Sequence, residues 1–479
     1  MTATLADVPR TSFRLPFGLG LGDTLKADSY DSENLVVGRT TSLGDAAAVY
    51  LGKLAEFEQM RRNVWLDCHG AHAVYVVGKR RSGKSYTLGV LCEGLAARSW
   101  LRLGEPDQAV LLIDTLNIYG TMHVRASAKE QSSTDRRIWQ LPADRICVRY
   151  VAPEQTRRTI AAPSIALTID PAWLTLEDWC SFFEVDPFSD PLGHLLSVVL
   201  DAVQRIWMTA AQPSGTGLAS GIGDLCHVLD RDPNALSFPE STREALRRRL
   251  LALERLGILG RPSTRVEALL TPGTITVCQL RDLDDRLRAL LVGVLIREIM
   301  RARARADAAV RRAAALEGDA ASAHENDESS ESVRSAANSM ARCWIAIDEA
   351  HNYLPSSGSL PSRPILRKLI TEGRNIGLSA VVATQQPSGL DTSIQRNADT
   401  LIVHSMSMRD DIAATEGMLN TLVPDAATWG TAERATGRVF EKVVRALPQG
   451  YCLLSTDTAN RVFGVRVRPR ITMHGGEAY

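Results

Sequence analysis

The sequence predicts an α/β fold built around a mostly parallel sheet. Short apolar runs rich in β-branched residues alternate with helical patterns, which is typical of parallel strands joined by crossover helices. A glycine-rich segment, residues 78–85, joins one of these runs to a helical pattern. A later apolar run ends in Asp348 and Glu349. With 479 residues, the chain is long enough for two or three domains and a large core.

The composition excludes several classes of protein. The chain has 55 Lys and Arg against 55 Asp and Glu, so a globally basic nucleic-acid binder is excluded, whereas a local basic patch is not. Its 8 cysteines form no C-x-x-C pair, which argues against a zinc ribbon or disulfide scaffold and favours a reducing compartment. We find no signal-peptide pattern and no apolar run near the roughly 18 residues of a membrane helix. A cytoplasmic protein without a membrane partner is therefore expected.

Residues 1–65 are expected to form a short N-terminal region. Residues 35–37 predict a strand, and residues 46–60 predict a helix. The glycines of residues 18–22 follow no apolar strand, so a turn is favoured there over a nucleotide loop.

The central part of the chain predicts the first half of an α/β core and then a helical insertion. Residues 66–152 form the first half, with strands expected at residues 73–77, 110–113 and 146–151. Residues 153–272 form the insertion, whose aromatic and leucine side chains fit a hydrophobic core better than a ligand site.

Residues 273–475 predict the second half of the core. A long helix is expected at residues 284–312, and its basic end fits either a solvated helix terminus or a nucleic-acid contact. Residues 318–338 are acidic and rich in Ala and Ser, which predicts a flexible loop. A shorter helix is expected at residues 365–374. The strands are expected at residues 274–280, 344–347, 379–383 and 401–404.

Residues 78–85, GKRRSGKS, match the pattern G-x-x-x-x-G-K-[ST] between a predicted strand and a predicted helix, as this phosphate-binding motif requires. Glycines allow backbone N–H groups to turn toward phosphates, and the helix N-terminus adds its dipole. Lys84 is expected to reach the β- and γ-phosphates of ATP, and the Ser85 hydroxyl to bind Mg²⁺. The predicted nucleotide-binding residues are Gly78, Ser82, Gly83, Lys84, Ser85 and Tyr86.

Two further strand ends predict the remaining parts of an ATPase site. Asp348 ends an apolar strand, where ligands bind in open α/β sheets, and is expected to take part in Mg²⁺ binding. Glu349 can act as general base for the attacking water, although an acidic helix start with Asp348 as N-cap fits the same residues. Gln385 follows another strand and is expected to orient water or sense the γ-phosphate; a polar loop start is the alternative. Residues 348–351 spell DEAH, but they lie too far from the P-loop for a helicase box.

The same motifs resemble the HerA branch of the HerA/FtsK ATPases. The resemblance lies in VYVVGKRRSGKSYTLG, LLIDTLNIYG, AIDEAHNYLP and LRKLITEGRNIGLSAVVATQQPSGLDTSIQRNADTLIVH. The closing LPQGYCLLSTDTANRVFGVRVRPRITMHGG also resembles the C-terminal segment of that family, so the resemblance covers roughly residues 65–152 and 273–475. It implies a RecA-like P-loop core in a hexameric ring with ATP and Mg²⁺ between subunits. It also implies action on double-stranded DNA with a nuclease or other effector partner, in repair or phage defence. An arginine from the neighbouring subunit completes such sites, and the motif position indicates Arg374, with Arg409 as the alternative; a helix-end salt bridge would also explain Arg374.

The sequence departs from this family in two places. The family often has D-P-H-G-E-Y after its second strand, whereas residues 114–119 are DTLNIY, so Ile118 replaces the glutamate. The family commonly begins with a β-barrel, and only about 65 residues precede the P-loop strand here, so the barrel is expected to be shortened or absent. The second departure favours another function, an ATP-binding oligomeric scaffold that activates an effector without moving DNA.

Overall fold

The computed structural model describes the chain in a series of segments. They are residues 34–38, 47–55, 62–97, 101–103, 108–126, 139, 145–210, 221–320, 341–419, 439–458 and 462–475.

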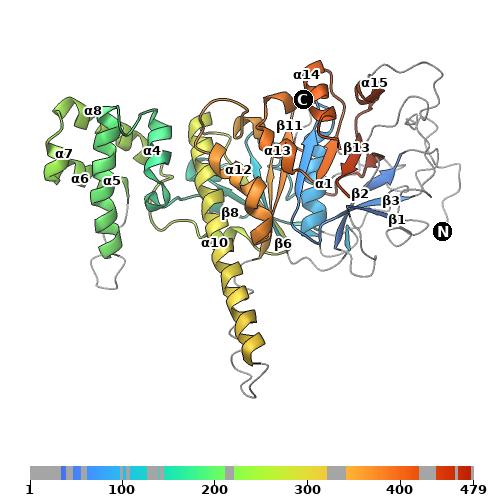
Figure 1. Cartoon of the computed structure of the whole chain (residues 1–479), viewed down its shortest axis with the longest axis horizontal. Helices are drawn as coiled ribbons and strands as arrows, with labels where there is room; N and C mark the ends of the chain where they lie inside the picture. The colour runs from blue at the N-terminus through green and yellow to red at the C-terminus, as the bar shows by residue number, and fades with distance from the viewer. Residues whose placement is uncertain are drawn as a thin grey trace.

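The described strands form one large sheet, most of it parallel (Figure 1). Its parallel part consists, in spatial order, of β12 (Thr400–Val403), β4 (Ala73–Val77), β11 (Leu378–Thr384), β10 (Arg342–Ile347), β6 (Gln108–Asp114), β9 (Thr274–Gln279), β7 (Cys147–Ala152) and β8 (Ser164–Ala166). All of these strands except β8 confirm predicted ones, with ends shifted by at most two residues. Strand β8 was not predicted, and it lies in the segment expected to be a helical insertion, residues 153–272. Strand β11 lies between the P-loop strand β4 and strand β10, which carries the acidic pair at its end. This arrangement confirms the predicted RecA-like α/β core.

Further strands continue the sheet beyond β12, and all of their pairings are antiparallel except that of β1 with β3. They are β13 (Tyr451–Thr456), β14 (Phe463–Val467), β2 (Ala48–Leu54), β3 (Asn63–Asp67), β1 (Asn34–Val37) and β5 (Arg102–Leu103). The helix predicted at residues 46–60 is therefore wrong where the chain is described, because β2 pairs with β14 on one side and β3 on the other. A Cβ on Gly52 would lie 2.1 Å from the Arg466 carbonyl oxygen, so β2 and β14 approach too closely at this point for any residue but glycine. Strand pairing has overridden the local helical preference.

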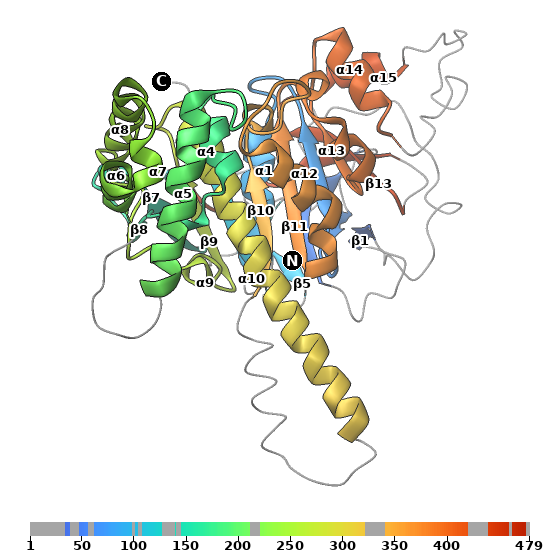
Figure 2. The ribbon, with the colours of Figure 1, turned by 60° about the vertical axis from the view of Figure 1, so that its left-hand side comes forward.

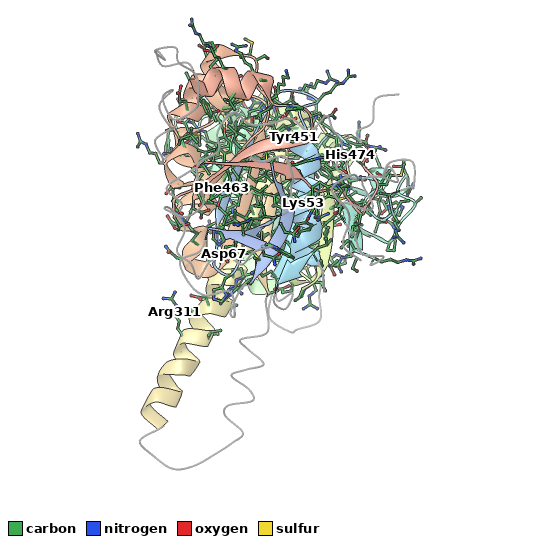
Figure 3. The ribbon with its side chains drawn as sticks, turned by 90° about the vertical axis from the view of Figure 1, so that its right-hand side faces the viewer. Lys53, Asp67, Arg311, Tyr451, Phe463 and His474 are labelled. Carbon is green, nitrogen blue, oxygen red and sulfur yellow. The ribbon has the colours of Figure 1, made fainter. Side chains whose placement is uncertain are left out.

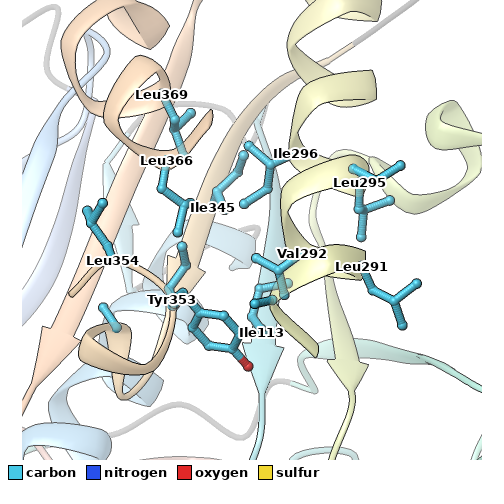
Figure 4. Packing of buried hydrophobic residues seen from close by; sticks show 14 of the residues in the cluster. Ile113, Leu291, Val292, Leu295, Ile296, Ile345, Tyr353, Leu354, Leu366 and Leu369 are labelled. Atoms are coloured by element: carbon cyan, nitrogen blue, oxygen red, sulfur yellow. The ribbon is translucent and has the colours of Figure 1, made fainter. Parts of the chain in front are cut away.

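Helices cover both faces of the parallel strands because successive side chains point to opposite faces. On one face, α1 (Lys84–Ala96) packs against Val74 and Val76 of β4. On the other, α10 (Asp285–Ala320) and α12 (Arg363–Glu372) pack in the same core as Tyr75 and Val77. Figure 4 shows this second core. Its labelled side chains are Ile113, Leu291, Val292, Leu295, Ile296, Ile345, Tyr353, Leu354, Leu366 and Leu369.

Helix α10 is longer than predicted. It runs past residue 312 to Ala320 and so includes the beginning of the segment predicted as an acidic loop, residues 318–338. The rest of that segment lies outside the described residues. The end of α10 projects from the body of the molecule, as Figure 2 shows, and Arg311 lies on this projecting part (Figure 3).

Most helices between β8 and β9 gather at the end of the molecule beyond the sheet (Figures 1 and 2). The helices between β8 and β9 are η5 (Pro171–Trp173), α4 (Leu176–Phe183), α5 (Pro191–Ala210), α6 (Ile222–Arg231), α7 (Pro233–Leu236), α8 (Glu240–Glu254) and α9 (Val266–Leu269). The short helix α3 (Glu154–Arg157) precedes β8. Arg297 of α10 joins this helical part to the core through two hydrogen bonds to the Asp178 carboxylate, of 3.0 and 2.6 Å.

The remaining helices follow β10 and lie at the ends of strands. They are η6 (Ala350–Asn352), η7 (Gly373–Ile376), η8 (Pro387–Gly389), α13 (Thr392–Asn397), α14 (Arg409–Glu416) and α15 (Val439–Ala446). None of the helices that the structure describes combines the length and apolar character that a membrane crossing requires.

Candidate nucleotide-binding site

The P-loop connects the end of β4 to the first turn of α1 in a tight, glycine-dependent turn. Gly83 has a φ of 109° and Arg81 a φ of 65°, both in the left-handed region. A Cβ on Gly78 would lie 2.5 Å from Ser82 Oγ and 2.6 Å from His404 Cβ, so only glycine fits. The Ser82 hydroxyl is buried and has no hydrogen-bond partner within the described residues. The loop therefore has an unused polar group beside its backbone N–H groups, which suits a phosphate ligand.

Lys84 contacts both residues of the acidic pair. Its Nζ lies 2.9 Å from Asp348 Oδ1 and 3.0 Å from Glu349 Oε1, and all three side chains are buried. Burial alone would lower the pKa of Lys84, but the two carboxylates raise it above its usual value. The lysine is thus held as a cation at the centre of the site.

Glu349 is directed into the site by an uncommon backbone conformation. Its φ is 51°, which few residues other than glycine adopt and which clusters at functional sites. Its Oε1 accepts hydrogen bonds from Lys84 and from the Gln385 side-chain amide, which follows β11. Its Oε2 is buried without a hydrogen-bond partner in the described part of the chain, and His351 Nδ1 lies 3.6 Å away. The structure therefore brings Lys84, Glu349 and Gln385 together.

The predicted metal-binding residues also meet. Burial would raise the pKa of Asp348, but Lys84 lowers it below its usual value, and hydrogen bonds from Ser85 and Tyr119 act in the same direction. Tyr86 differs, since its side chain faces the C-terminal segment: its hydroxyl accepts a 2.7 Å hydrogen bond from the Arg470 N–H. Its ring lies edge-on to His474 at 5.4 Å.

Arg374 lies at the opposite edge of the sheet. It precedes β11, whereas Gln385 follows this strand of 7 residues, so about 20 Å of extended chain separates the two. The predicted helix 365–374 ends earlier, at Glu372, and Arg374 lies in η7. Its guanidinium donates to the Asn397 carbonyl at 3.0 Å and lies 3.4 Å from Asp399 Oδ2. Arg374 therefore cannot reach the P-loop of its own chain.

Two arginines from the basic end of α10 contact the segment that holds Arg374. Arg303 is buried and donates to the Ile376 carbonyl at 3.0 Å, and Arg311 donates to the Asn375 carbonyl at 3.4 Å. These arginines thus have partners within the chain. The alternative Arg409 begins α14, is exposed, and lies at the P-loop edge of the sheet.

Tyr119 is a site residue that our sequence analysis did not identify. Its hydroxyl donates to Asp348 Oδ2 at 2.9 Å and lies 3.1 Å from the Ser85 carbonyl oxygen. Asp114 fixes this tyrosine by accepting the N–H groups of Ile118 and Tyr119, at 3.1 and 3.0 Å. Burial raises the pKa of Asp114 to about 6. The available signal was the tyrosine that ends DTLNIY, which agrees with the family pattern where Ile118 departs from it.

His404 packs against the P-loop glycines Gly78 and Gly83. From the sequence, it was predicted only as the end of a strand. It is fully buried; one ring nitrogen lies 2.9 Å from Thr87 Oγ1 and the other 3.0 Å from the Tyr451 carbonyl oxygen. The carbonyl can only accept, so Nδ1 carries the proton and Nε2 accepts from Thr87. Burial lowers the pKa of His404 to about 4, so the ring is neutral at pH 7.

The residues present fit a magnesium–nucleotide complex. The Ser85 hydroxyl and the Asp348 carboxylate are oxygen donors of the kind that Mg²⁺ prefers. The Ser82 hydroxyl, which has no hydrogen-bond partner among the described residues, is a polar group that could contact a phosphate. Lys84 supplies the positive charge that such a ligand requires.

Comparison with known proteins finds several chains that are similar to this one. The DNA double-strand break repair helicase HerA of Pyrococcus furiosus is 25% identical over 176 residues, which is 36% of this chain and 32% of that protein. The alignment thus spans about a third of that relative's length. Among solved structures, VirB4 of Thermoanaerobacter pseudethanolicus has 13% identity, a TM-score of 0.48, and coverage of 89% of this chain and 98% of that one. The conjugative coupling protein TrwB has 14% identity, a TM-score of 0.49, and coverage of 89% of both chains.

A family model gives the assignment directly. Residues 50–299, more than half of the chain, match the family described as Helicase HerA, central domain. The matched range includes the P-loop and the loop that holds Tyr119. The chain therefore belongs to the HerA central-domain family.

Proposed function

We propose that the protein binds and hydrolyses ATP with Mg²⁺. The observation that supports this proposal best is the convergence of Lys84, Asp348, Glu349 and Gln385 at one edge of the sheet. Lys84 binds the β- and γ-phosphates, and Ser85 and Asp348 hold Mg²⁺, which neutralises charge on the phosphates. Glu349 accepts the proton of the attacking water, and Gln385 orients the Glu349 carboxylate.

We further propose that hydrolysis takes place between subunits of a ring, most simply a hexamer. Arg374 lies too far from its own P-loop to act there, and its side chain is 38% exposed. An arginine at that edge can reach the nucleotide only in a neighbouring copy. It would stabilise the charge on the transferred phosphoryl group and make turnover depend on assembly.

The ring is proposed to translocate or remodel double-stranded DNA together with a nuclease or other effector, in DNA repair or antiviral defence. Membership of the HerA family and a relative named as a DNA double-strand break repair helicase support this choice. The second candidate is a ring-shaped scaffold that activates an effector without moving DNA. The net charge of zero favours this candidate, because motors that track DNA usually need a basic path.

ATPase rates with and without duplex DNA test the proposal. The wild type should hydrolyse ATP, and duplex DNA should raise the rate if the protein is a motor. Lys84→Ala should lose activity under both conditions, whereas Lys442→Ala, an exposed lysine of α15, should retain it. Activity in Lys84→Ala equal to wild type would refute the nucleotide site. Hydrolysis that does not respond to duplex DNA would favour the scaffold.

A further inference from the structure

We propose that Arg470 is a positioning residue for the Mg²⁺ site, acting through Tyr119 on the metal-binding Asp348. The inference rests on the proposed ATPase function. It adds to the site a residue of the C-terminal segment, which lies outside residues 50–299, the range that the family model matches. Arg470 follows β14, so it is distant in sequence from every motif of the site.

The C-terminal segment is anchored to the P-loop helix by a buried ion cluster. Glu93 of α1 and Arg468 are both fully buried, and Arg470 is 1% exposed. Arg468 Nη1 lies 2.8 Å from Glu93 Oε2, and Arg470 Nε lies 3.4 Å from Glu93 Oε1. Glu93 also accepts the Thr472 N–H at 3.0 Å and its hydroxyl at 2.6 Å. Burial would raise the pKa of Glu93, but the two arginines hold it below its usual value.

The guanidinium of Arg470 lies near Tyr86 of α1 and near Tyr119, which donates a hydrogen bond to Asp348. It is 5.9 Å from the ring centres of both Tyr86 and Tyr119, within the range of cation–π attraction. One Nη1 hydrogen bond joins it to His474 Nδ1 at 3.0 Å, and Nη2 donates to Thr472 Oγ1 at 2.7 Å. Its orientation is therefore fixed from several directions.

Gly89 of α1 makes room for this guanidinium. A Cβ at Gly89 would lie 2.7 Å from Arg470 Cζ and 2.7 Å from Nη1. The guanidinium cannot retreat freely, because Glu93, Thr472 and His474 hold its nitrogens. A methyl group added at Gly89 should therefore displace Arg470 while leaving every charge in place.

The consequence for the metal follows from the next contact. The Tyr119 ring faces Arg470, and its hydroxyl donates to the Asp348 oxygen that Lys84 does not contact. Groups that orient metal ligands typically change metal affinity 10- to 100-fold when they are removed. We therefore expect the Arg470 guanidinium to set the Mg²⁺ affinity of the nucleotide complex while leaving metal-free nucleotide binding alone.

The test measures metal binding separately from turnover. Mn²⁺ binding to the full chain is followed by electron paramagnetic resonance with a non-hydrolysable ATP analogue at saturation, and analogue affinity is also measured without metal. Arg470→Gln, Tyr119→Phe and Gly89→Ala should each weaken Mn²⁺ binding about tenfold or more, with metal-free analogue affinity unchanged. Because Arg470 acts through Tyr119, the double variant Arg470→Gln/Tyr119→Phe should bind Mn²⁺ no more weakly than Tyr119→Phe alone.

Two controls separate positioning from general damage. Gly223→Ala changes another helical glycine, whose added Cβ would have no other side chain or neighbouring segment of the described residues within 4 Å. Arg445→Gln removes an arginine whose side chain is 42% exposed and whose guanidinium pairs with Glu441 one turn earlier in α15. Both variants should bind Mn²⁺ like the wild type.

The outcomes decide between clear alternatives. Mn²⁺ affinity within twofold of wild type in Gly89→Ala and Arg470→Gln would overturn the proposal, and so would equal losses of metal-free and metal-bound affinity. If Arg470→Gln does not fold, Gly89→Ala decides alone. Retention of nucleotide binding by Lys84→Ala would instead refute the proposed function, so the two failures are distinguishable.

Discussion

Lys84 Nζ lies 2.9 Å from Asp348 Oδ1, and the two side chains are 3% and 4% exposed. Burial alone would raise the pKa of Asp348, whereas the ammonium of Lys84 lowers it, so the carboxylate stays ionised. In the proposed nucleotide complex, the same ammonium would turn toward the phosphates. Asp348 and Glu349 would then lose their cationic partner, and Asp348 with Ser85 would be available to hold Mg²⁺, so nucleotide and metal should bind cooperatively.

Lys84→Ala should remove ATP binding and also destabilise the nucleotide-free protein. Removing one partner of a buried ion pair typically costs about 3–5 kcal/mol, because the other charge stays buried without compensation. Calorimetric titration with ATP and urea unfolding measure the two effects, with Lys442→Ala as the control. Wild-type affinity in Lys84→Ala would contradict the role of this lysine.

Glu349→Gln should bind ATP with near-normal affinity and hydrolyse it roughly 10²- to 10⁴-fold more slowly. The amide retains the shape of the side chain but cannot accept a proton from water. Single-turnover hydrolysis and analogue binding measure the two quantities. Glu254→Gln, an exposed glutamate at the end of α8, serves as control. A turnover rate equal to wild type would remove Glu349 from the base role.

Arg374→Ala should bind ATP normally and hydrolyse it on the order of 10³-fold more slowly or worse, as for arginine fingers elsewhere. Its own P-loop is untouched, and the missing charge belongs to the neighbouring site. Mixing it with Lys84→Ala subunits should restore part of the activity, because some interfaces then combine an intact P-loop with an intact arginine.

Arg396→Ala tests an exposed arginine near the same edge of the sheet and should leave turnover unchanged. If mixtures of the two inactive variants co-assemble and stay inactive, the shared site is wrong. The helix-end interaction with Asn397 and Asp399 would then be the whole role of Arg374.

His404 should make the protein less stable as the pH falls from about 6.5 toward 4. The folded state keeps the ring neutral, with its pKa lowered to about 4, whereas the unfolded chain takes up a proton near pH 6.5. Unfolding therefore gains a proton in this window, and stability falls by at most about 1.4 kcal/mol per pH unit.

Urea unfolding at pH 7 and pH 5 measures this dependence. His404→Asn retains a donor for the Tyr451 carbonyl but does not titrate, so its unfolding free energy should change less between the two pH values. An equal change in both proteins would show that other groups cause the acid sensitivity.

The parallel core could be predicted because its strands need little context. The run Ala73–Val77 is apolar at every position and buried on both faces, so composition alone identifies it. Strand β2 could not be identified in this way. Its single alanine, its glycine and its lysine suit several conformations. Its pairing with β3 and with β14, which is distant in the sequence, makes it a strand.

The site residues also fall into those that a local motif predicts and those that depend on contacts between distant segments. Lys84, Asp348, Glu349 and Gln385 belong to contiguous motifs with a fixed place at strand ends, and the structure brings them together. Residues that support them come from elsewhere. Tyr119 contacts Ser85 and Asp348, and His404 contacts Thr87 and Tyr451, which are partners distant in the sequence. Arg470 is held near Tyr119 by its contact with Glu93.

Strand β11 has one further consequence. All 7 of its residues are buried, so the strand cannot stretch or buckle without disturbing the core. It begins next to the segment that holds Arg374 and ends next to Gln385. In the proposed ring, each subunit would contact two nucleotides, one near each end of β11. Gln385 would contact the nucleotide in its own P-loop, and Arg374 the nucleotide of the neighbouring subunit. Each ATP site would therefore be connected to the next through one buried strand. A displacement of Gln385 at one γ-phosphate would displace Arg374 at the next site, because β11 has no flexible joint between them.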